Sequence, residues 1–122
     1  MAPEDNDFAV VVDREDGDAV VHVRGEVDIY TAPQLRDSVL DVLAEGVQRL
    51  VLEVAGVRFM DSTGLGVLAM AHKKLSAVGG RVVVRSPSPT IRKLLELTKM
   101  NTVVEVENGA GDQEASESAG TP

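Results

Sequence analysis

The stretch Arg58-Phe-Met-Asp-Ser-Thr-Gly-Leu-Gly66 holds the most chemically informative residues of the chain. The residues before it, 50–54, are apolar except for one Glu, which indicates a strand buried on both faces. The residues after it, 65–78, carry apolar side chains at helical spacing. Because Asp, Ser and Thr are favoured where a helix begins, the stretch is expected to join a buried strand to the amino terminus of a helix.

Ser62 lies at this predicted helix start. The first N–H groups of a helix lack partners within the helix and, together with the helix dipole, attract negative charge. A phosphoryl group on the Ser62 hydroxyl is the simplest anion for this position. The alternative interpretation is that Ser62 only caps the helix.

A length of 122 residues is enough for one domain with a real core. The absence of cysteine excludes disulfides and thiolate metal sites and fits a reducing cytoplasm. The acidic N-terminal residues lack the apolar segment of a signal peptide, and no apolar run approaches the roughly 20 residues that a membrane span needs. A cytoplasmic protein without membrane contact is therefore expected.

The formal net charge of −8 belongs to the two ends of the chain. Of the 20 acidic residues, three lie in 1–7 and four in 107–122, which leaves 13 acidic and 12 basic residues between them. The predicted organisation is an acidic flexible N-terminus at 1–7, a folded domain at 8–106 and a disordered acidic tail at 107–122. Without a basic stripe, and with only three aromatic residues, nucleic acid is not expected as a partner.

The pattern along the chain predicts five strands and three helices in the order β-β-α-β-α-β-α-β. Asp16-Gly17 favours a hairpin between the first two strands. Thr31 with Pro33, and Ser88 with Pro89, are typical of helix starts. The predicted strands span 8–12, 19–23, 47–54, 81–85 and 102–106, with a loop at 25–30. This order indicates an α/β fold in which helices pack on a mixed, largely parallel sheet.

The second helix, at 62–78, has two different faces on a wheel of about 100° per residue. The arc expected to face the sheet carries Leu65, Val67, Leu68, Ala71, Leu75 and Val78. The opposite arc carries Ser62, Gly66, Ala69, Met70 and Lys73. Small side chains and an exposed methionine are unusual on a helix that only needs solubility. A partner surface and a bare solvent-exposed face are both consistent with this pattern.

The segment Phe59-Met-Asp-Ser-Thr-Gly-Leu-Gly66, together with Gly25-Glu-Val-Asp28 and Thr31-Ala-Pro33, closely resembles the anti-sigma-factor antagonists. These are single STAS-domain proteins of bacterial partner-switching systems. The resemblance covers residues 8–106 and implies the STAS fold. Many members have a glycine where Lys99 stands, so either Lys99 is left-handed, at a cost of about 1 kcal/mol, or the turn differs.

The resemblance also implies a phosphorylation switch. The serine directly after the aspartate, here Ser62, is expected to be phosphorylated by an anti-sigma factor that is itself a serine kinase. The unphosphorylated protein is expected to bind that kinase and release its sigma factor, and a PP2C-type serine phosphatase is expected to reverse the modification. The residues expected to contact the partner are Asp28, Asp61, Ser62, Thr63, Gly64, Gly66, Ala69, Met70 and Lys73.

No enzyme, cofactor site or metal site is predicted. The G-x-S-x-G elbow is absent around Ser62, and neither His22 nor His72 has a second ligand at metal-binding spacing. For Asp28 the two interpretations are a contact with the kinase or a role in phosphorylation, and a turn residue that caps the Thr31 helix. For Asp61 they are orientation of the Ser62 hydroxyl and capping of the helix, and both can hold. The competing functional hypothesis is a STAS scaffold that is not phosphorylated, or a ligand-binding subunit of a stress-signalling assembly.

Overall fold

The computed structural model describes residues 7–108, and their elements follow the predicted order. The bounds are β1 Ala9–Glu15, β2 Asp18–Val27, α1 Ala32–Leu43, β3 Arg49–Met60, α2 Ser62–Ser76, β4 Arg81–Arg85, α3 Pro89–Leu97 and β5 Glu105–Glu107. Within the described part of the chain, no helix has the length and apolar character to cross a membrane. Residues 1–6 of the predicted N-terminal segment and residues 109–122 of the predicted tail lie outside this range.

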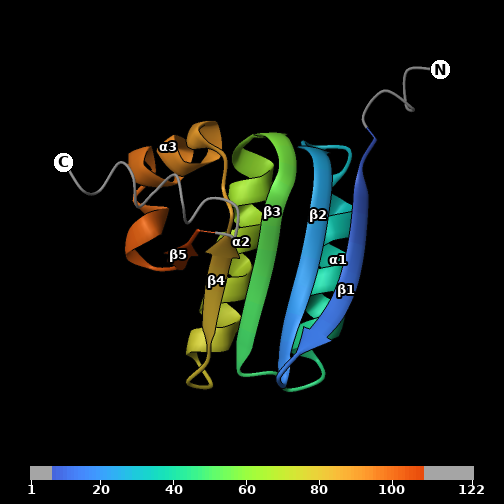
Figure 1. The fold of residues 1–122 in the computed structure, drawn as a ribbon. Coiled ribbons are helices and arrows are strands. Elements are labelled where there is room, and N and C mark those ends of the chain that lie inside the picture. The colour runs from blue at the N-terminus through green and yellow to red at the C-terminus, as the bar shows by residue number, and fades with distance from the viewer. Residues whose placement is uncertain (1–6, 109–122) are drawn as a thin grey trace.

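The strands form one sheet in the order β1-β2-β3-β4-β5 (Figure 1). β1 is antiparallel to β2, and the remaining neighbours are parallel, which confirms the mixed, largely parallel sheet. The β1–β2 hairpin turns at Asp16 and Gly17, whose φ angles are 51° and 86°. Positive φ at both positions is typical of a tight two-residue hairpin turn, as the Asp-Gly pair predicts.

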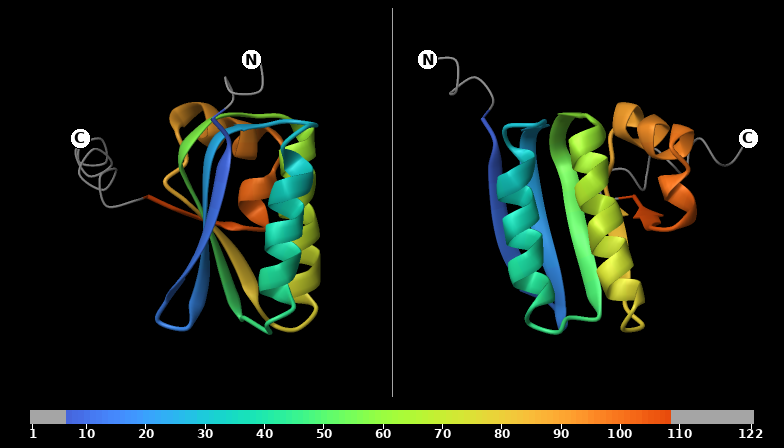
Figure 2. Two further views of the ribbon diagram at one scale, coloured as in Figure 1. Left: turned by 90° about the vertical axis from the view of Figure 1, so that its right-hand side faces the viewer. Right: turned by 180° about the vertical axis from the view of Figure 1, so that it is seen from behind.

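All three helices lie on one face of the sheet, with α1 and α2 side by side (Figure 2). The core between the layers combines strand residues such as Val21 and Leu52 with Leu35 of α1, Leu68 of α2 and Ile91 of α3. Full burial of each such side chain contributes about 1.5–3 kcal/mol. Burial of this shared core fixes the position of α2 on the sheet.

The opposite face of the sheet carries no helix, yet its central valines are at most 1% exposed. These valines are Val20, Val51 and Val83. Arg85 on β4 contacts Glu15 on β1 at 3.4 Å, so this pair spans β2 and β3. Arg49 on β3 contacts Glu107 on β5 at 2.9 Å and spans β4. The aliphatic stems of the arginines exclude water from the valines, while their charged ends stay paired.

β2 and β3 are longer than the sequence predicts. Residues 25–27 are predicted as part of a loop, but they continue β2 and pair with the end of β3, which runs to Met60. The pairing is irregular between His22 and Arg24 and between Gly25 and Glu26. Bulges of this kind bend a strand without ending it. Pairing with a neighbouring strand therefore overrides the local turn preference of Gly25.

The last strand begins and ends later than predicted. Met100–Thr102 forms a 3₁₀ turn, so β5 starts at Glu105 and not at residue 102. Glu107, predicted as the first tail residue, ends β5, and its carbonyl accepts a hydrogen bond from the Ser86 N–H at 2.8 Å. Lys99 has a φ of 64°, so the left-handed alternative for this position is confirmed.

The helix boundaries agree with the sequence at most positions. The Ser88 side chain accepts a hydrogen bond from the Ile91 N–H at 3.2 Å, which confirms the cap before Pro89. The prediction that Val78 faces the sheet is wrong. Because α2 ends at Ser76, Val78 leaves the helix and is 64% exposed.

Gly64 and Gly66 lie two residues apart in α2 but have opposite surroundings. A Cβ atom at Gly64 would lie 2.5 Å from Met60 Cγ and 2.9 Å from Val27 Cγ1, whereas nothing lies within 4 Å of a Cβ at Gly66. Gly64 therefore allows the first turn of α2 to approach β2 and β3 closely.

We expect Gly64→Ala to lower the free energy of unfolding by about 1–3 kcal/mol, because the new methyl group overlaps core side chains. Gly66→Ala is the matched control. It should raise the free energy of unfolding by up to about 1 kcal/mol, because alanine favours a helix and meets no obstacle. Thermal and urea unfolding of both variants measure the difference. Equal stability of the two variants would contradict the close packing at Gly64.

Candidate functional site

The candidate site lies where β2 and β3 end and α1 and α2 begin (Figure 1). These two strands are parallel neighbours, so their carboxyl ends meet at one edge of the sheet. The Asp61 N–H donates to the Val27 carbonyl at 3.1 Å. This bond places the start of α2 beside the loop at 28–31, which leads into α1.

Asp61 is the N-cap of α2. Its backbone is extended, with φ −106° and ψ −168°, and its Oδ1 accepts the Thr63 N–H at 2.8 Å. The Thr63 hydroxyl donates to the same oxygen. The capping role predicted as one alternative for Asp61 is therefore present.

The pKa of Asp61 lies below the usual value for an aspartate. The largest cause is the hydrogen bond from the Thr63 hydroxyl, and backbone hydrogen bonds from Thr63 and Gly64 act in the same direction. Partial loss of solvent opposes the shift. Since each of these bonds favours the ionised carboxylate, a negative charge is held at the head of α2.

Ser62 is the first residue of α2, as predicted, and it is exposed. Its hydroxyl forms no hydrogen bond to any group within residues 7–108. The alternative in which Ser62 caps the helix is wrong, because Asp61 occupies the cap. The Ser62 side chain is therefore open to a reagent from outside.

Asp28 organises the loop that faces this helix start. Its Oδ1 accepts the Tyr30 N–H at 2.9 Å and the Thr31 N–H at 3.1 Å. The Thr31 hydroxyl in turn accepts the Asp28 N–H at 2.9 Å and donates to the Glu26 carbonyl at 2.8 Å. Thr31 stands at the N-cap of α1, but its side chain does not cap the helix because these bonds use its hydroxyl. Asp28 thus has the predicted turn role, and its contact with a partner stays a prediction.

Four of the five residues on the predicted outer arc of α2 are exposed, and their contact with a partner stays a prediction. Ser62, Gly66, Ala69 and Lys73 are exposed along one side of the helix. Thr63 is half-buried. We name the four exposed residues the α2 face.

Two predicted contact residues are covered instead. Met70 is half-buried and packs against the core, so the expected exposed methionine is not found. Gly64 lies on the buried side of α2, where the helix packs against Met60 and Val27. Neither Met70 nor Gly64 is therefore part of the exposed α2 face.

The sequence reasoning did not identify two exposed apolar residues beside the site. Ile29 is 63% exposed and Tyr30 is 88% exposed, and both lie in the loop that Asp28 holds. The sequence feature that could have indicated their exposure is a pair of large apolar side chains in a short loop, between Asp28 and Thr31. Such residues are enriched where proteins meet partners.

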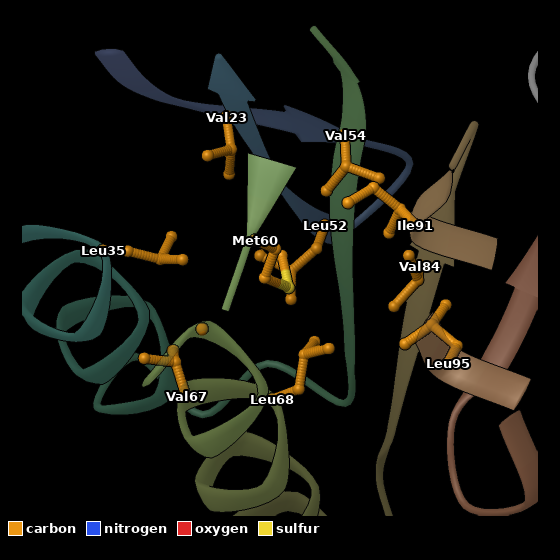
Figure 3. Close-up of a pocket in the computed structure, with 11 residues that line it drawn as sticks. Val23, Leu35, Leu52, Val54, Met60, Val67, Leu68, Val84, Ile91 and Leu95 are labelled. Carbon is orange, nitrogen blue, oxygen red and sulfur yellow. The ribbon is translucent and has the colours of Figure 1, made fainter. Parts of the chain in front are cut away.

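A small internal cavity lies between the start of α2 and the sheet (Figure 3). Met60 and Leu52 from the sheet and Val67 and Leu68 from α2 are among its lining residues, all of them apolar or glycine. Its volume is about 10 Å³, which is at the lower limit for holding a single water molecule. It offers no polar group to a ligand. Within residues 7–108, no group of three or more His, Asp or Glu side chains is placed to hold a metal ion.

Comparison with known proteins agrees with this arrangement. A family model described as STAS domain matches residues 9–112. The chain is 32% identical over 108 residues to the anti-sigma-B factor antagonist of Listeria monocytogenes, covering 86% of this chain and 93% of that relative.

Solved structures give the same result. The crystal structure of an anti-sigma factor antagonist from Mycobacterium paratuberculosis has a TM-score of 0.78 at 30% identity, covering 89% of this chain and 92% of that one. The Bacillus cell fate determinant SpoIIAA in its phosphorylated form has a TM-score of 0.69 at 25% identity, with 91% and 99% covered. The chain therefore belongs to the STAS domain family, within the group of anti-sigma-factor antagonists.

Proposed function

We propose that the unphosphorylated chain binds an anti-sigma factor serine kinase and thereby releases a sigma factor, and that phosphorylation of Ser62 ends this binding. The observation that carries the proposal is the Ser62 hydroxyl, which is exposed at the head of α2 and has no hydrogen-bond partner among the described residues. A kinase reaches this oxygen without first breaking any bond of the fold. The protein acts as a regulatory binding module and not as an enzyme.

The surface around Ser62 suits a protein partner. The loop at 28–31 exposes Ile29 and Tyr30. The α2 face exposes Gly66 and Ala69, and residues this small allow a partner to approach the helix closely. Asp28 and Asp61 add acidic groups that can meet cations on the kinase. The partner therefore covers apolar residues of the loop together with the bare start of α2.

A phosphate on Ser62 opposes this contact in two ways. It adds a charge of about −1.5 to −2 directly beside the ionised Asp61. It also places a strongly hydrated group where a partner would pack, and removing that hydration costs free energy. Since about 1.4 kcal/mol changes affinity tenfold, a modest penalty is sufficient to switch binding.

The names of similar proteins support the proposal. The Listeria monocytogenes relative is an anti-sigma-B factor antagonist. SpoIIAA, which shares this fold, has been solved in a phosphorylated form. Removal of the phosphate from Ser62 by a PP2C-type serine phosphatase completes the proposed cycle.

We expect wild-type protein to take up phosphate from ATP when it is incubated with its cognate anti-sigma factor kinase, and Ser62→Ala to take up none. Ser76→Ala is the control, because Ser76 is an exposed serine at the other end of the same helix. It should be modified at the wild-type rate. Intact-mass spectrometry measures the incorporation. No phosphate on the wild type would favour the scaffold that is not phosphorylated, and phosphate on Ser62→Ala would show that a residue other than Ser62 is the acceptor.

We expect Ile29→Ser to weaken kinase binding on the order of tenfold, because it removes an exposed apolar contact beside Ser62. Val78→Ser is the control: Val78 is 64% exposed, close to the 63% of Ile29, but follows the opposite end of α2. Isothermal titration calorimetry with the unphosphorylated variants gives both affinities. If the two variants bind equally well, the loop at 28–31 is not part of the contact.

A further inference from the structure

Two hydroxyl groups lie next to each other at the head of α2, and within residues 7–108 only that of Thr63 has a hydrogen-bond partner. We propose that Asp61 is a positioning residue that restricts phosphorylation to Ser62 by holding the neighbouring Thr63 hydroxyl. This inference rests on the function proposed above, and it assigns to Asp61 a task separate from starting the helix. It explains how a kinase distinguishes adjacent hydroxyls that differ by one methyl group.

The contacts of the two residues are opposite. The Thr63 side chain is half-buried and donates its hydroxyl hydrogen to Asp61 Oδ1. The Thr63 N–H donates to the same oxygen at 2.8 Å, so the residue is held at two points. Hydrogen bonds to a carboxylate are roughly twice as strong as neutral ones. Ser62 is exposed, and its hydroxyl has no such bond within the described chain.

Phosphoryl transfer requires the hydroxyl that Asp61 withholds. In the transfer from ATP, the hydroxyl oxygen forms a bond to the γ-phosphorus, and the bond from that phosphorus to the oxygen of ADP breaks. The hydroxyl proton passes to a base on the kinase. The Thr63 hydrogen already points at Asp61, so it cannot meet this base until that bond breaks. A phosphate on Thr63 would also lie against the Asp61 carboxylate.

The ionisation of Asp61 supports this role. The Thr63 hydroxyl is the largest cause of the lowered pKa of Asp61. A carboxylate whose pKa is lowered stays ionised near neutral pH, and it is a weak base. Asp61 therefore holds the Thr63 proton as an acceptor and does not remove it.

To test the role of Asp61, variants that also carry Ser62→Ala are incubated with the cognate kinase and ATP. The residue that takes up phosphate is then identified. Asp61→Gly removes the carboxylate, and glycine at an N-cap costs a helix little. Asp61→Asn is the matched control because its amide oxygen still accepts the Thr63 hydroxyl. We expect no phosphate on Ser62→Ala alone, and phosphate on Thr63 in Asp61→Gly/Ser62→Ala, on the order of tenfold more than in Asp61→Asn/Ser62→Ala.

The outcomes separate this inference from the proposed function. If wild-type protein accepts no phosphate, both are overturned. If wild type is phosphorylated on Ser62 and Asp61→Gly/Ser62→Ala remains unmodified, only the role of Asp61 is overturned. Circular dichroism confirms that each variant keeps its helices. The rate at which Ser62 is phosphorylated in Asp61→Gly and in Asp61→Asn measures how far each substitution itself slows the kinase, and the Thr63 signals are compared relative to these rates.

A second measurement needs no kinase. Carboxyl carbon NMR of Asp61 should show a low pKa in wild type and in Thr63→Ser, which keeps the donor. In Thr63→Val the pKa should rise toward the ordinary aspartate value, because the hydroxyl donor is missing. If Asp61 depended only on the Thr63 N–H, its pKa would be the same in all three proteins. An unchanged pKa in Thr63→Val therefore overturns the proposal.

Discussion

The parallel pairing of β2 with β3 is the constraint on which the site depends. Val27 pairs with Met60 at the end of this ladder, and the Asp61 N–H continues the contact to the Val27 carbonyl at 3.1 Å. The loop at 28–31 and the junction of β3 with α2 at Asp61, which lie far apart in the sequence, are thereby fixed next to each other. Gly64 completes the arrangement, because any larger residue would hold the first turn of α2 away from these strands.

The two faces of the sheet are covered by different means. Helices cover one face, and ion pairs of Arg49 and Arg85 cross the other. These pairs lie on the face of the central valines, where Val11 of β1 is 61% exposed. Apolar side chains are also exposed in the loop at 28–31, where Tyr30 is 88% exposed. In the proposed function, the loop and the α2 face would join these apolar residues to the hydroxyl of Ser62.

Features encoded by a few neighbouring residues were predictable from the sequence. The Asp16-Gly17 hairpin, the Ser88 cap and the start of α2 at Ser62 depend on local backbone preferences, and each is present. Features that depend on distant partners were not predictable. Residues 25–27 resemble a loop until β3 pairs with them, and the assignment of Asp61 and not Ser62 as the cap depends on backbone angles that both residue types permit. The exposure of Ile29 depends likewise on how the loop is held.

Because Asp61 caps α2 and Ser62 does not, the proposed phosphate on Ser62 would change binding without changing the fold. If Ser62 were the cap, its modification would remove a hydrogen bond from the first turn of α2, and the switch would act through helix stability. Asp61 supplies that bond instead, accepting the Thr63 N–H at 2.8 Å. The Ser62 oxygen has no structural task among the described residues, so a group added to it alters only charge and hydration at the surface. In the proposed switch, the capping hydrogen bond would therefore stay in place when Ser62 is modified, and the change in charge and hydration would act at the surface that a partner meets.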